Sequence, residues 1–290
     1  MDLWQQYERP STVQEALTLL ERAGGRVIAG GTDLLLDMQQ GRQKPVETLV
    51  DICGIPEMTD IRLADDHVYL GGAVTHRQIL DNAILADQAA CLVQASGVIG
   101  GPQVRNVATI GGNVAHGLPA ADGTIALLAL GAEAEIAGQD GRRWQPLDQI
   151  FVSPGETTFD RARQILVQFR FPAAGRREGS AFSRVMRPQG VAIAILNMAA
   201  WLRLDPQGKV EHARLAIGPA GPTPWRARQA EARLIGRPVE RASLAELQKD
   251  ILAEAAFRES RHRATRRYRQ HLVRTLVERT VPLAAERADG

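Results

Sequence analysis

Cysteine is scarce in this chain of 290 residues, which contains only two. Two cysteines cannot build a disulfide scaffold, a four-cysteine zinc site or the four-thiolate frame of an iron–sulfur cluster within this chain. Long hydrophobic runs are also missing, because no apolar stretch reaches the roughly 18 residues that span a bilayer. The first ten residues lack a basic start followed by an apolar core. We therefore expect no membrane span, no signal peptide and a cytoplasmic location.

Lysine and aromatic residues are scarce as well, since three of the 35 basic residues are lysines and 4% of all residues are aromatic. The charge is unevenly spread: residues 1–150 carry 10 basic and 19 acidic side chains, and residues 151–290 carry 25 and 14. Few aromatic side chains that could stack on bases stand among the arginines of the basic half, so we expect no nucleic-acid partner. The hydrophobic content of 44% is ordinary for a globular chain of two or three packed units.

Hydrophobic periodicity predicts helices alternating with strands in the first half, and antiparallel strands followed by helices in the second. Thr12 and Glu15 have the spacing of a capping box, and Asp65 and Asp66 suit the turn of a hairpin. Residues 97–123 hold seven glycines and predict an irregular segment. Residues 175–179 are the predicted linker. The predicted helices are 12–23, 34–40, 76–80, 86–96, 124–131 and two around 244–251 and 268–276; the predicted strands are 26–29, 48–52, a hairpin over 59–73, 133–137, 161–172, 180–185, 191–204 and 209–218.

Two glycine-rich turns carry the chemical signal, and the first lies in VIAGGTDLLL, residues 27–36. A predicted strand runs into Gly30, Gly31 and Thr32 and then into a helix. Such a turn presents backbone N–H groups at a helix N-terminus, which suits a phosphate or pyrophosphate. The spacing is neither G-x-G-x-x-G nor G-x-x-x-x-G-K-[ST], which disfavours the usual dinucleotide fold and the P-loop. A tight strand–helix turn without a ligand is the alternative interpretation.

The second turn lies in TIGGNVAHGLPAAD, residues 109–122. Gly111 and Gly112 are expected to offer further backbone donors, Asn113 offers a donor and an acceptor, and Asp122 is an acceptor for sugar hydroxyls or an adenine amine. Neither turn is followed by a lysine that would hold a transferable γ-phosphate. We therefore expect both turns, about 80 residues apart, to meet on one diphosphate and to hold a nucleotide without hydrolysing it.

Both segments resemble the FAD-binding medium subunit of the molybdenum hydroxylases, the family of carbon monoxide dehydrogenase and xanthine dehydrogenase. The resemblance extends through LVDICGIPEM, YLGGAVTHRQI and ESRHRATRRYRQHLVRTLVERT, and covers about residues 3–282. It implies an α+β chain with a two-lobed FAD-binding domain of the vanillyl-alcohol-oxidase type, followed by a C-terminal flavoprotein domain of antiparallel sheet plus helices. The implied boundaries are 1–175 for the FAD domain, with lobes of about 1–57 and 58–175, then 178–282 and a tail of 283–290.

In such subunits the first turn wraps the pyrophosphate, and the second supports the ribityl chain, the pyrophosphate and the flavin edge. Leu166 falls where a backbone contact is expected, and Arg184 near a position usually held by lysine. His116 stands where a small residue or threonine is common, so it either lies beside the flavin or is a loop histidine bonded to backbone. Residues 187–195 lack the acidic residue often found there. The resemblance implies FAD contacts at Ile28, Ala29, Gly30, Gly31, Thr32, Asp33, Leu34, Gly101, Thr109, Ile110, Gly111, Gly112, Asn113, His116, Asp122, Leu166 and Arg184.

The function implied is electron transfer, with FAD on this chain, two 2Fe–2S clusters on a small partner subunit and molybdopterin on a large one. Electrons would then leave for a small-molecule acceptor that the sequence does not identify. We expect no catalytic acid or base and no metal ligand in this chain, since the cofactor supplies the chemistry. Two alternatives stay open: a stand-alone flavin oxidoreductase of the same fold, and a flavin-free docking subunit.

Overall fold

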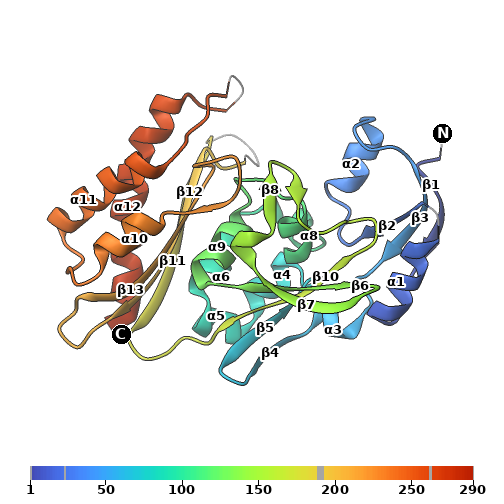
Figure 1. The fold of residues 1–290 in the computed structure, drawn as a ribbon, viewed down its shortest axis with the longest axis horizontal. Coiled ribbons are helices and arrows are strands. Elements are labelled where there is room, and N and C mark those ends of the chain that lie inside the picture. The colour runs from blue at the N-terminus through green and yellow to red at the C-terminus, as the bar shows by residue number, and fades with distance from the viewer. Residues whose placement is uncertain (1, 23, 188–192, 261–262, 290) are drawn as a thin grey trace.

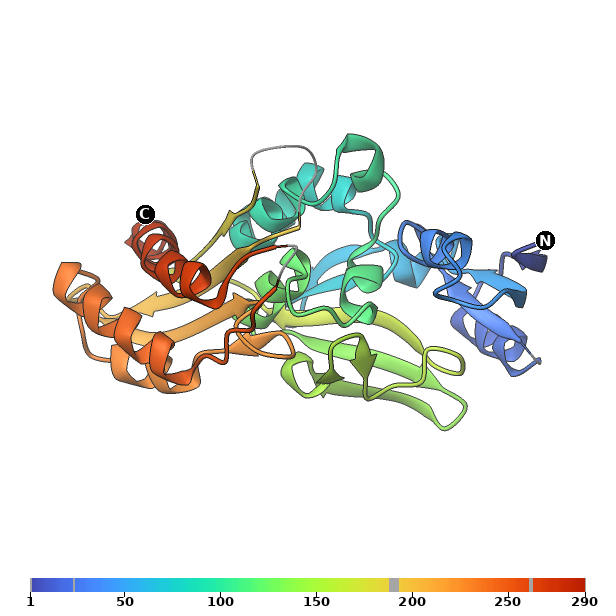
Figure 2. The ribbon, with the colours of Figure 1, turned by 90° about the horizontal axis from the view of Figure 1, so that it is seen from above.

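The computed structural model describes residues 2–22, 24–187, 193–260 and 263–289. Two lobes and a C-terminal domain lie in a row, with the N-terminal lobe at one end of the molecule and the C-terminal domain at the other (Figures 1 and 2). The predicted α+β architecture, two lobes followed by an antiparallel sheet covered by helices, is confirmed.

The first lobe is built on a parallel sheet of three strands in the order β1-β3-β2. The edge strand β1 was not predicted from the sequence; it pairs with β3 along residues that alternate little between apolar and polar. Thr12 caps the first helix by accepting a hydrogen bond from the backbone N–H of Glu15 at 3.1 Å, as predicted. The elements are β1 (Trp4–Glu8), α1 (Val13–Glu21), β2 (Gly25–Ile28), α2 (Leu34–Gln39), β3 (Val46–Asp51) and α3 (Pro56–Thr59).

The second lobe contains a five-stranded antiparallel sheet in the order β4-β5-β10-β6-β7. Asp65 and Asp66 turn the first hairpin with φ of 49° and 57°, a conformation that aspartate tolerates better than most residues. The elements are β4 (Ile61–Ala64), β5 (His67–Gly71), α4 (His76–Asp81), α5 (Ala83–Gln88), α6 (Ala90–Gly97), α7 (Pro102–Arg105), α8 (Ile110–Ala115), α9 (Asp122–Leu130), β6 (Glu133–Gly138), β7 (Gly141–Pro146), a 3-10 turn η1 (Leu147–Gln149), β8 (Phe151–Ser153), β9 (Glu156–Thr157) and β10 (Ile165–Pro172).

The glycine-rich segment 97–123 is irregular only in part: the prediction holds for 98–101, 106–109 and 116–121 and is wrong for the helices between them. It contains α7 and α8 and the start of α9, and two of its glycines, Gly111 and Gly112, lie inside α8. A Cβ on Gly111 would lie 2.4 Å from the carbonyl oxygen of Gly72. Glycine therefore serves a close contact between α8 and the chain after β5, which outweighs its low helix propensity. The predicted helix 86–96 is also divided, since Ala89 separates α5 from α6.

The C-terminal domain is an antiparallel sheet in the order β11-β12-β13-β14, with helices against both faces. In Figure 1, α10, α11 and α12 cover the outer face, and α6 and α9 of the second lobe lie against the inner one. Alternate residues of β12 accordingly enter two cores: Ala199 and Trp201 face the second lobe, whereas Met198 and Ala200 face the helices. The elements are β11 (Glu178–Val185), β12 (Leu196–Leu204), β13 (Val210–Gly218), β14 (Trp225–Arg226), α10 (Arg228–Leu234), α11 (Arg241–Glu254) and α12 (Arg266–Asp289).

Some predicted boundaries in this domain shift. Strand β11 begins at Glu178, so the last two residues of the predicted linker 175–179 belong to the sheet. The predicted strand 191–204 begins at Leu196, and its first two residues lie outside the described part of the chain, as do residues 188–192 as a whole. Tyr268 was placed on the apolar face of the last helix, but it is 44% exposed, and Leu272 and Leu276 are buried without it. That helix continues without a break through Asp289.

Candidate functional site

The first glycine turn follows β2 and leads into α2, as the sequence indicated. Gly31 has φ of +66°, a left-handed conformation that suits glycine, and its carbonyl accepts the N–H of Leu35 at 3.0 Å. A Cβ on Gly30 would lie 2.0 Å from the carbonyl oxygen of Val107. The first turn therefore lies directly against the segment that precedes α8, and only a residue without a side chain fits there.

The backbone amides of the two turns differ in availability. Within the described residues, the amides of residues 30–34 donate no hydrogen bond, so five successive N–H groups are free at the start of α2. Those of residues 110–113 are all used: their acceptors are the carbonyl of Val74 (3.0 Å), the carbonyl of Gly72 (2.8 Å), and the side chain (3.1 Å) and carbonyl (3.0 Å) of Thr109. The expectation that Gly111 and Gly112 offer free backbone donors is therefore wrong.

His116 connects α8 with the first turn. It is the C-cap residue of α8, and its Nδ1 lies 3.5 Å from Oδ2 of Asp33, the N-cap residue of α2. The hydrogen bond from His116 lowers the pKa of the Asp33 carboxyl, and the Thr32 hydroxyl acts in the same direction. The imidazole thus faces a carboxylate of the first turn, rather than the backbone group that one alternative proposed.

Asp122 and Arg184 form a buried ion pair. Nη1 of Arg184 lies 2.7 Å from Oδ2 of Asp122, and the two side chains are only 8% and 7% exposed. Asn197, on the adjacent strand β12, donates from Nδ2 to the other carboxylate oxygen at 2.6 Å. Burial raises the pKa of the Asp122 carboxyl, and Arg184 and Asn197 offset this only in part. Both carboxylate oxygens are thus engaged in joining the second lobe to the C-terminal domain, so Asp122 is not a free acceptor.

The remaining predicted residues have mainly structural contacts. Thr109 caps α8 through its side chain, and Oδ1 of Asn113 accepts the N–H of Thr124 at 3.0 Å, which ties α8 to α9. Leu166 lies on β10, and its carbonyl would be 2.7 Å from a Cβ on Gly72. Gly101 caps α7 and its carbonyl accepts the N–H of Arg105. The other members of the set are buried Ile28 and Ile110 and half-buried Ala29, Thr32 and Leu34.

Sequence reasoning missed a third pair of glycines, Gly71 and Gly72, although the letters were visible in YLGGAVTHRQI. Added Cβ atoms would lie 2.2 Å from the carbonyl of Met58 and 2.7 Å from that of Leu166. Since Gly72 also receives the N–H of Gly111, this pair holds α8 against the second sheet. A Gly-Gly pair directly after a predicted strand was the signal that identified the first turn, and it applied here too.

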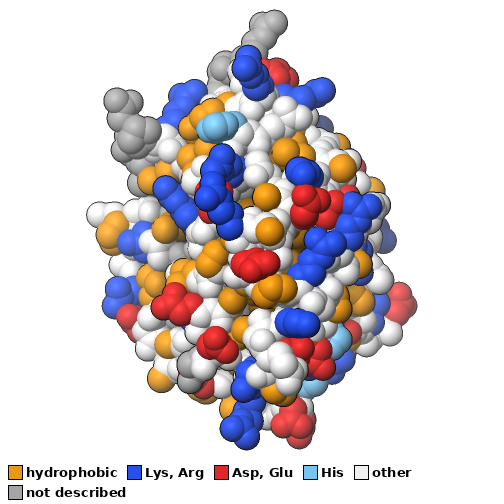
Figure 3. All heavy atoms as spheres, turned by 90° about the vertical axis from the view of Figure 1, so that its left-hand side faces the viewer, with side chains coloured by type: hydrophobic (Ala, Val, Ile, Leu, Met, Phe, Trp, Pro, Cys, Tyr) orange, Lys and Arg blue, Asp and Glu red, His pale blue; other side chains and the backbone are white. Residues whose placement is uncertain are grey.

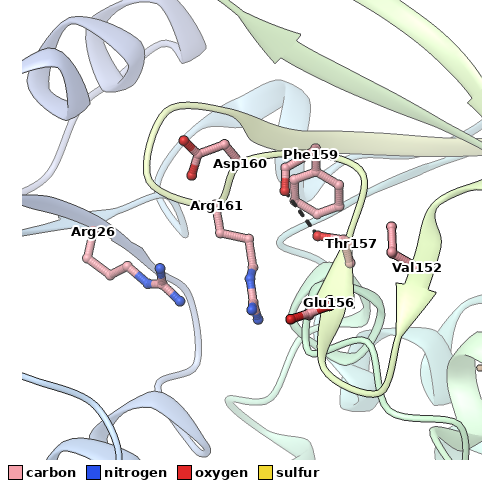
Figure 4. Close-up of a pocket in the computed structure, with 7 residues that line it drawn as sticks. All are labelled: Arg26, Val152, Glu156, Thr157, Phe159, Asp160 and Arg161. Atoms are coloured by element: carbon pink, nitrogen blue, oxygen red, sulfur yellow. Dashed lines mark hydrogen bonds between the residues drawn. The ribbon is translucent and has the colours of Figure 1, made fainter. Parts of the chain in front are cut away.

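A cavity of about 330 Å³ was also missed (Figure 4). Arg26 of β2 contributes to it from the first lobe, and its other lining residues lie between Val152 and Arg161 of the second. Arg161 donates from Nη1 to the carbonyl of Ala115 at 3.0 Å and from Nη2 to that of Gly155 at 2.9 Å. The cavity wall is therefore fastened to the end of α8, beside His116.

The positive charge of the second half is dispersed. On the face shown in Figure 3, Lys and Arg side chains are interleaved with Asp and Glu. Ion pairs of this half include Arg203 with Glu211 and Arg274 with Glu278, both at 2.9 Å. Among the described residues no group of three or more His, Cys, Asp or Glu is arranged to hold a metal ion, and no helix there is long and apolar enough to cross a membrane.

Comparison with known proteins gives the family. Residues 4–174 match the FAD binding domain in molybdopterin dehydrogenase, and residues 180–283 match the CO dehydrogenase flavoprotein C-terminal domain. The chain is 32% identical over 287 residues to the xanthine dehydrogenase FAD-binding subunit of Escherichia coli O157:H7, covering 98% of this chain and 97% of the relative. It is 32% identical over 234 residues to the carbon monoxide dehydrogenase medium chain of Hydrogenophaga pseudoflava, covering 80% of each.

The fold agrees with that similarity. A solved structure of carbon monoxide dehydrogenase from Hydrogenophaga pseudoflava, a form lacking the Mo-pyranopterin moiety, superposes with a TM-score of 0.91 at 30% identity, covering 98% of both chains. The geometry of the first turn fits FAD, because free amides at the start of a helix and a closely packed backbone are what a diphosphate requires. The chain therefore belongs to the FAD-binding subunits of the molybdenum hydroxylases.

Proposed function

We propose that residues 30–34 hold the diphosphate of FAD and that α8 supports the flavin from the side. The observation that carries this proposal is the row of five free amides in the first turn, packed against the backbone before α8. Amides already fixed by the fold need no reorganisation to receive an anion. The amides of α8 are occupied, so we assign residues 109–113 the role of holding the first turn in place rather than donating to the phosphates.

When bound, FAD supplies the redox chemistry of this chain. The described residues contribute binding and orientation. His116 and Asp33 lie at the junction of the two turns and hold them together through their 3.5 Å contact. The buried pair of Asp122 and Arg184 fixes the C-terminal domain against the second lobe. We propose that these two junctions set the relative position of the three parts and so the site in which the flavin ring is held.

We propose that the chain works in a heterotrimer with a large molybdopterin subunit and a small subunit carrying two 2Fe–2S clusters. Electrons would reach the FAD of this chain from the clusters and leave for an external small-molecule acceptor. The two cysteines support this division of labour, because neither Cys53 nor Cys91 belongs to a group of ligands in the described residues. A cytoplasmic location remains part of the proposal and can be checked by cell fractionation.

The test is to purify the chain with and without co-expressed neighbours, record its absorption spectrum and identify the released cofactor by mass spectrometry. FAD on the chain, together with molybdenum and iron in the complex, is the expected result. A colourless chain that takes up no FAD would support the docking-subunit alternative. A yellow chain that reduces a substrate without partners would support the stand-alone oxidoreductase.

A further inference from the structure

A second cavity, of about 300 Å³, lies where the second lobe meets the C-terminal domain. Strand β11 passes there between α6 and α12 (Figure 1). The lining comes from the junction of α5 with α6, the linker, the start of β11, strand β12 and the end of α12. Glu178 of the lining precedes Arg184 by six residues on β11, about 20 Å of strand. The cavity is therefore separate from the candidate FAD site, and its volume suits a small molecule.

Ser180 of β11 brings three parts of this cavity together. Its carbonyl accepts a hydrogen bond from Nη1 of Arg287 at 2.6 Å, and its hydroxyl oxygen accepts the N–H of Cys91 at 3.2 Å. Ser180 also pairs with Trp201 of β12. Residues directly opposite one another in an antiparallel pair project from the same face of the sheet. The guanidinium of Arg287, the start of α6 and the indole of Trp201 therefore surround one serine.

Trp201 presents a hydrogen-bond donor to the cavity. The residue is only 8% exposed, and the guanidinium of Arg214 covers its ring with 4.2 Å to the centroid. Its indole N–H donates to none of the described residues, although a buried indole usually finds a partner. The nitrogen is not sealed off by protein atoms, and the residue lines the cavity. An acceptor that enters the cavity would complete this hydrogen bond.

Arg287 supplies a positive charge with a fixed orientation. Its Nη1 is held by the carbonyl of Ser180 and by Oε1 of Gln94 at 3.0 Å. Nε and Nη2 bond to no described residue, and no acidic side chain in that part of the chain forms an ion pair with Arg287. The Nε–Nη2 edge of a guanidinium binds a carboxylate through two parallel hydrogen bonds. The fold thus orients Arg287 while its carboxylate-binding edge stays free.

The cavity also carries negative charge, at a different place. Glu178 has partners already, since its carboxylate accepts the N–H of Gly175 at 2.8 Å and lies 3.6 Å from Arg203. Asp87 accepts from the side-chain amide of Gln88 through Oδ2 only, and none of the cations that the structure describes forms an ion pair with it. Asp87 and Arg287 line the same cavity without pairing with each other. Two unlike charges therefore face one cavity from separate positions.

We propose that this cavity binds a small zwitterion of the amino-acid type. Its carboxylate would take the free edge of Arg287 and the N–H of Trp201, and its ammonium group would take the free oxygen of Asp87. A simple anion would leave Asp87 unpaired beside it, and a simple cation would meet the guanidinium. The alanines that line the rest of the cavity leave room for a small apolar side chain. This site does not depend on where the flavin lies.

The experiment titrates the full chain, in its complex where partners co-purify, by isothermal calorimetry. The probes are glycine, L-leucine and two analogues of leucine that each lack one charge: 4-methylpentanoate, without the ammonium group, and 3-methylbutylamine, without the carboxylate. We expect both amino acids to bind, and each analogue to bind at least about tenfold more weakly than L-leucine, because each loses one charged contact.

Two variants test the two ends of the site. Arg287→Gln should raise the Kd for L-leucine and for 4-methylpentanoate at least about tenfold, because a bidentate charged contact is lost. Asp87→Asn should raise the Kd for L-leucine about threefold to tenfold, as suits a more exposed contact, and leave that for 4-methylpentanoate unchanged. Arg274→Gln on α12 and Asp81→Asn on α4 are the matched controls at exposed positions. Circular dichroism verifies that each variant folds.

Each result decides the inference. Binding of L-leucine and glycine that both variants weaken supports it. It is overturned if neither amino acid binds at millimolar concentration. Equal affinity for L-leucine and 4-methylpentanoate overturns it as well, because the cavity would then be a plain anion site. An unchanged Kd for L-leucine in either variant places the amino acid elsewhere, even where the wild type binds it. None of these results bears on FAD, whose retention is measured separately by absorbance.

Discussion

Nδ1 of His116 lies 3.5 Å from Oδ2 of Asp33, which joins the end of α8 to the start of α2 across 83 residues of sequence. The two side chains are 30% and 65% exposed. An exposed pair of this kind contributes little to global stability. Because it lies between the two turns of the proposed FAD site, we expect it to act more locally, on the distance between the lobes.

Breaking this pair should weaken FAD binding by a small, non-additive amount. We expect Asp33→Asn and His116→Gln each to raise the Kd for FAD about twofold to fivefold, because an exposed pair contributes only a small free energy. The double variant should be no weaker than either single one, because both remove the same contact. Asp37→Asn is the control: it lies on the same helix but pairs with Arg42 at 2.6 Å. Fully additive effects in the double variant would contradict the contact.

Adjacent glycines of α8 should respond differently to alanine. In Gly111→Ala the Cβ meets the Gly72 carbonyl oxygen at 2.4 Å, a backbone atom that cannot move aside cheaply. We expect a loss of about 1–3 kcal/mol in the free energy of unfolding, typical of overpacking, together with weaker FAD retention. In Gly112→Ala the nearest atom is Oγ1 of Thr109 at 3.1 Å, and the gain in helix propensity offsets the tight contact. Urea unfolding measures both variants, and equal losses would contradict this account.

The parts of the fold that depend on local chemistry were predictable. Thr75 and Gln78 form a complete capping box at the start of α4, with the N–H of Thr75 bonded to the Gln78 side chain at 2.8 Å. Asp65 and Asp66 turn the hairpin as their tolerance of positive φ indicates. The first glycine turn likewise lies between a strand and a helix, because glycine placement there is decided by local geometry.

What the sequence could not reveal depends on contacts distant along the chain. Glycine is required at position 111 of α8 because the carbonyl oxygen of Gly72, 39 residues earlier, occupies the space that a side chain would fill. Asp122 looked like a free acceptor because its partners, Arg184 and Asn197, follow 62 and 75 residues later. Arg26 precedes the first turn in the sequence, but only the folded chain shows that it faces a cavity. Local patterns therefore identified the two glycine turns but not the partners of the charged groups around them.

Removing Arg184 and removing Asp122 from the buried ion pair should lower the free energy of unfolding with different pH dependence. In Arg184→Met the Asp122 carboxylate loses its cation, and its pKa is already raised by burial. When a carboxyl has a raised pKa in the folded state, the free energy of unfolding falls as the pH rises. The variant's loss of stability relative to wild type should therefore be larger at pH 8 than at pH 5. In Asp122→Asn the buried guanidinium is left charged at both pH values, and the deficit, about 3 kcal/mol for a broken buried pair, should change little. Urea unfolding at the two pH values tests this, and parallel behaviour of the two variants would contradict it.

His76 should make the folded chain sensitive to acid. Its side chain is buried, with Nδ1 3.2 Å from the Ser96 hydroxyl, and burial lowers its pKa from 6.5 to about 4. As the pH falls, His76 is protonated in the unfolded chain before it is protonated in the folded one. Its effect on the free energy of unfolding is therefore absent above about pH 6.5 and grows as the pH falls toward 4. We expect a loss of about 2 kcal/mol from this group between pH 7 and pH 5. His76→Gln should flatten that part of the stability profile, whereas His212→Gln, at an exposed position on β13, should leave it unchanged. Urea unfolding across this pH range measures the slope, and a slope that persists in His76→Gln would assign the acid sensitivity to another group.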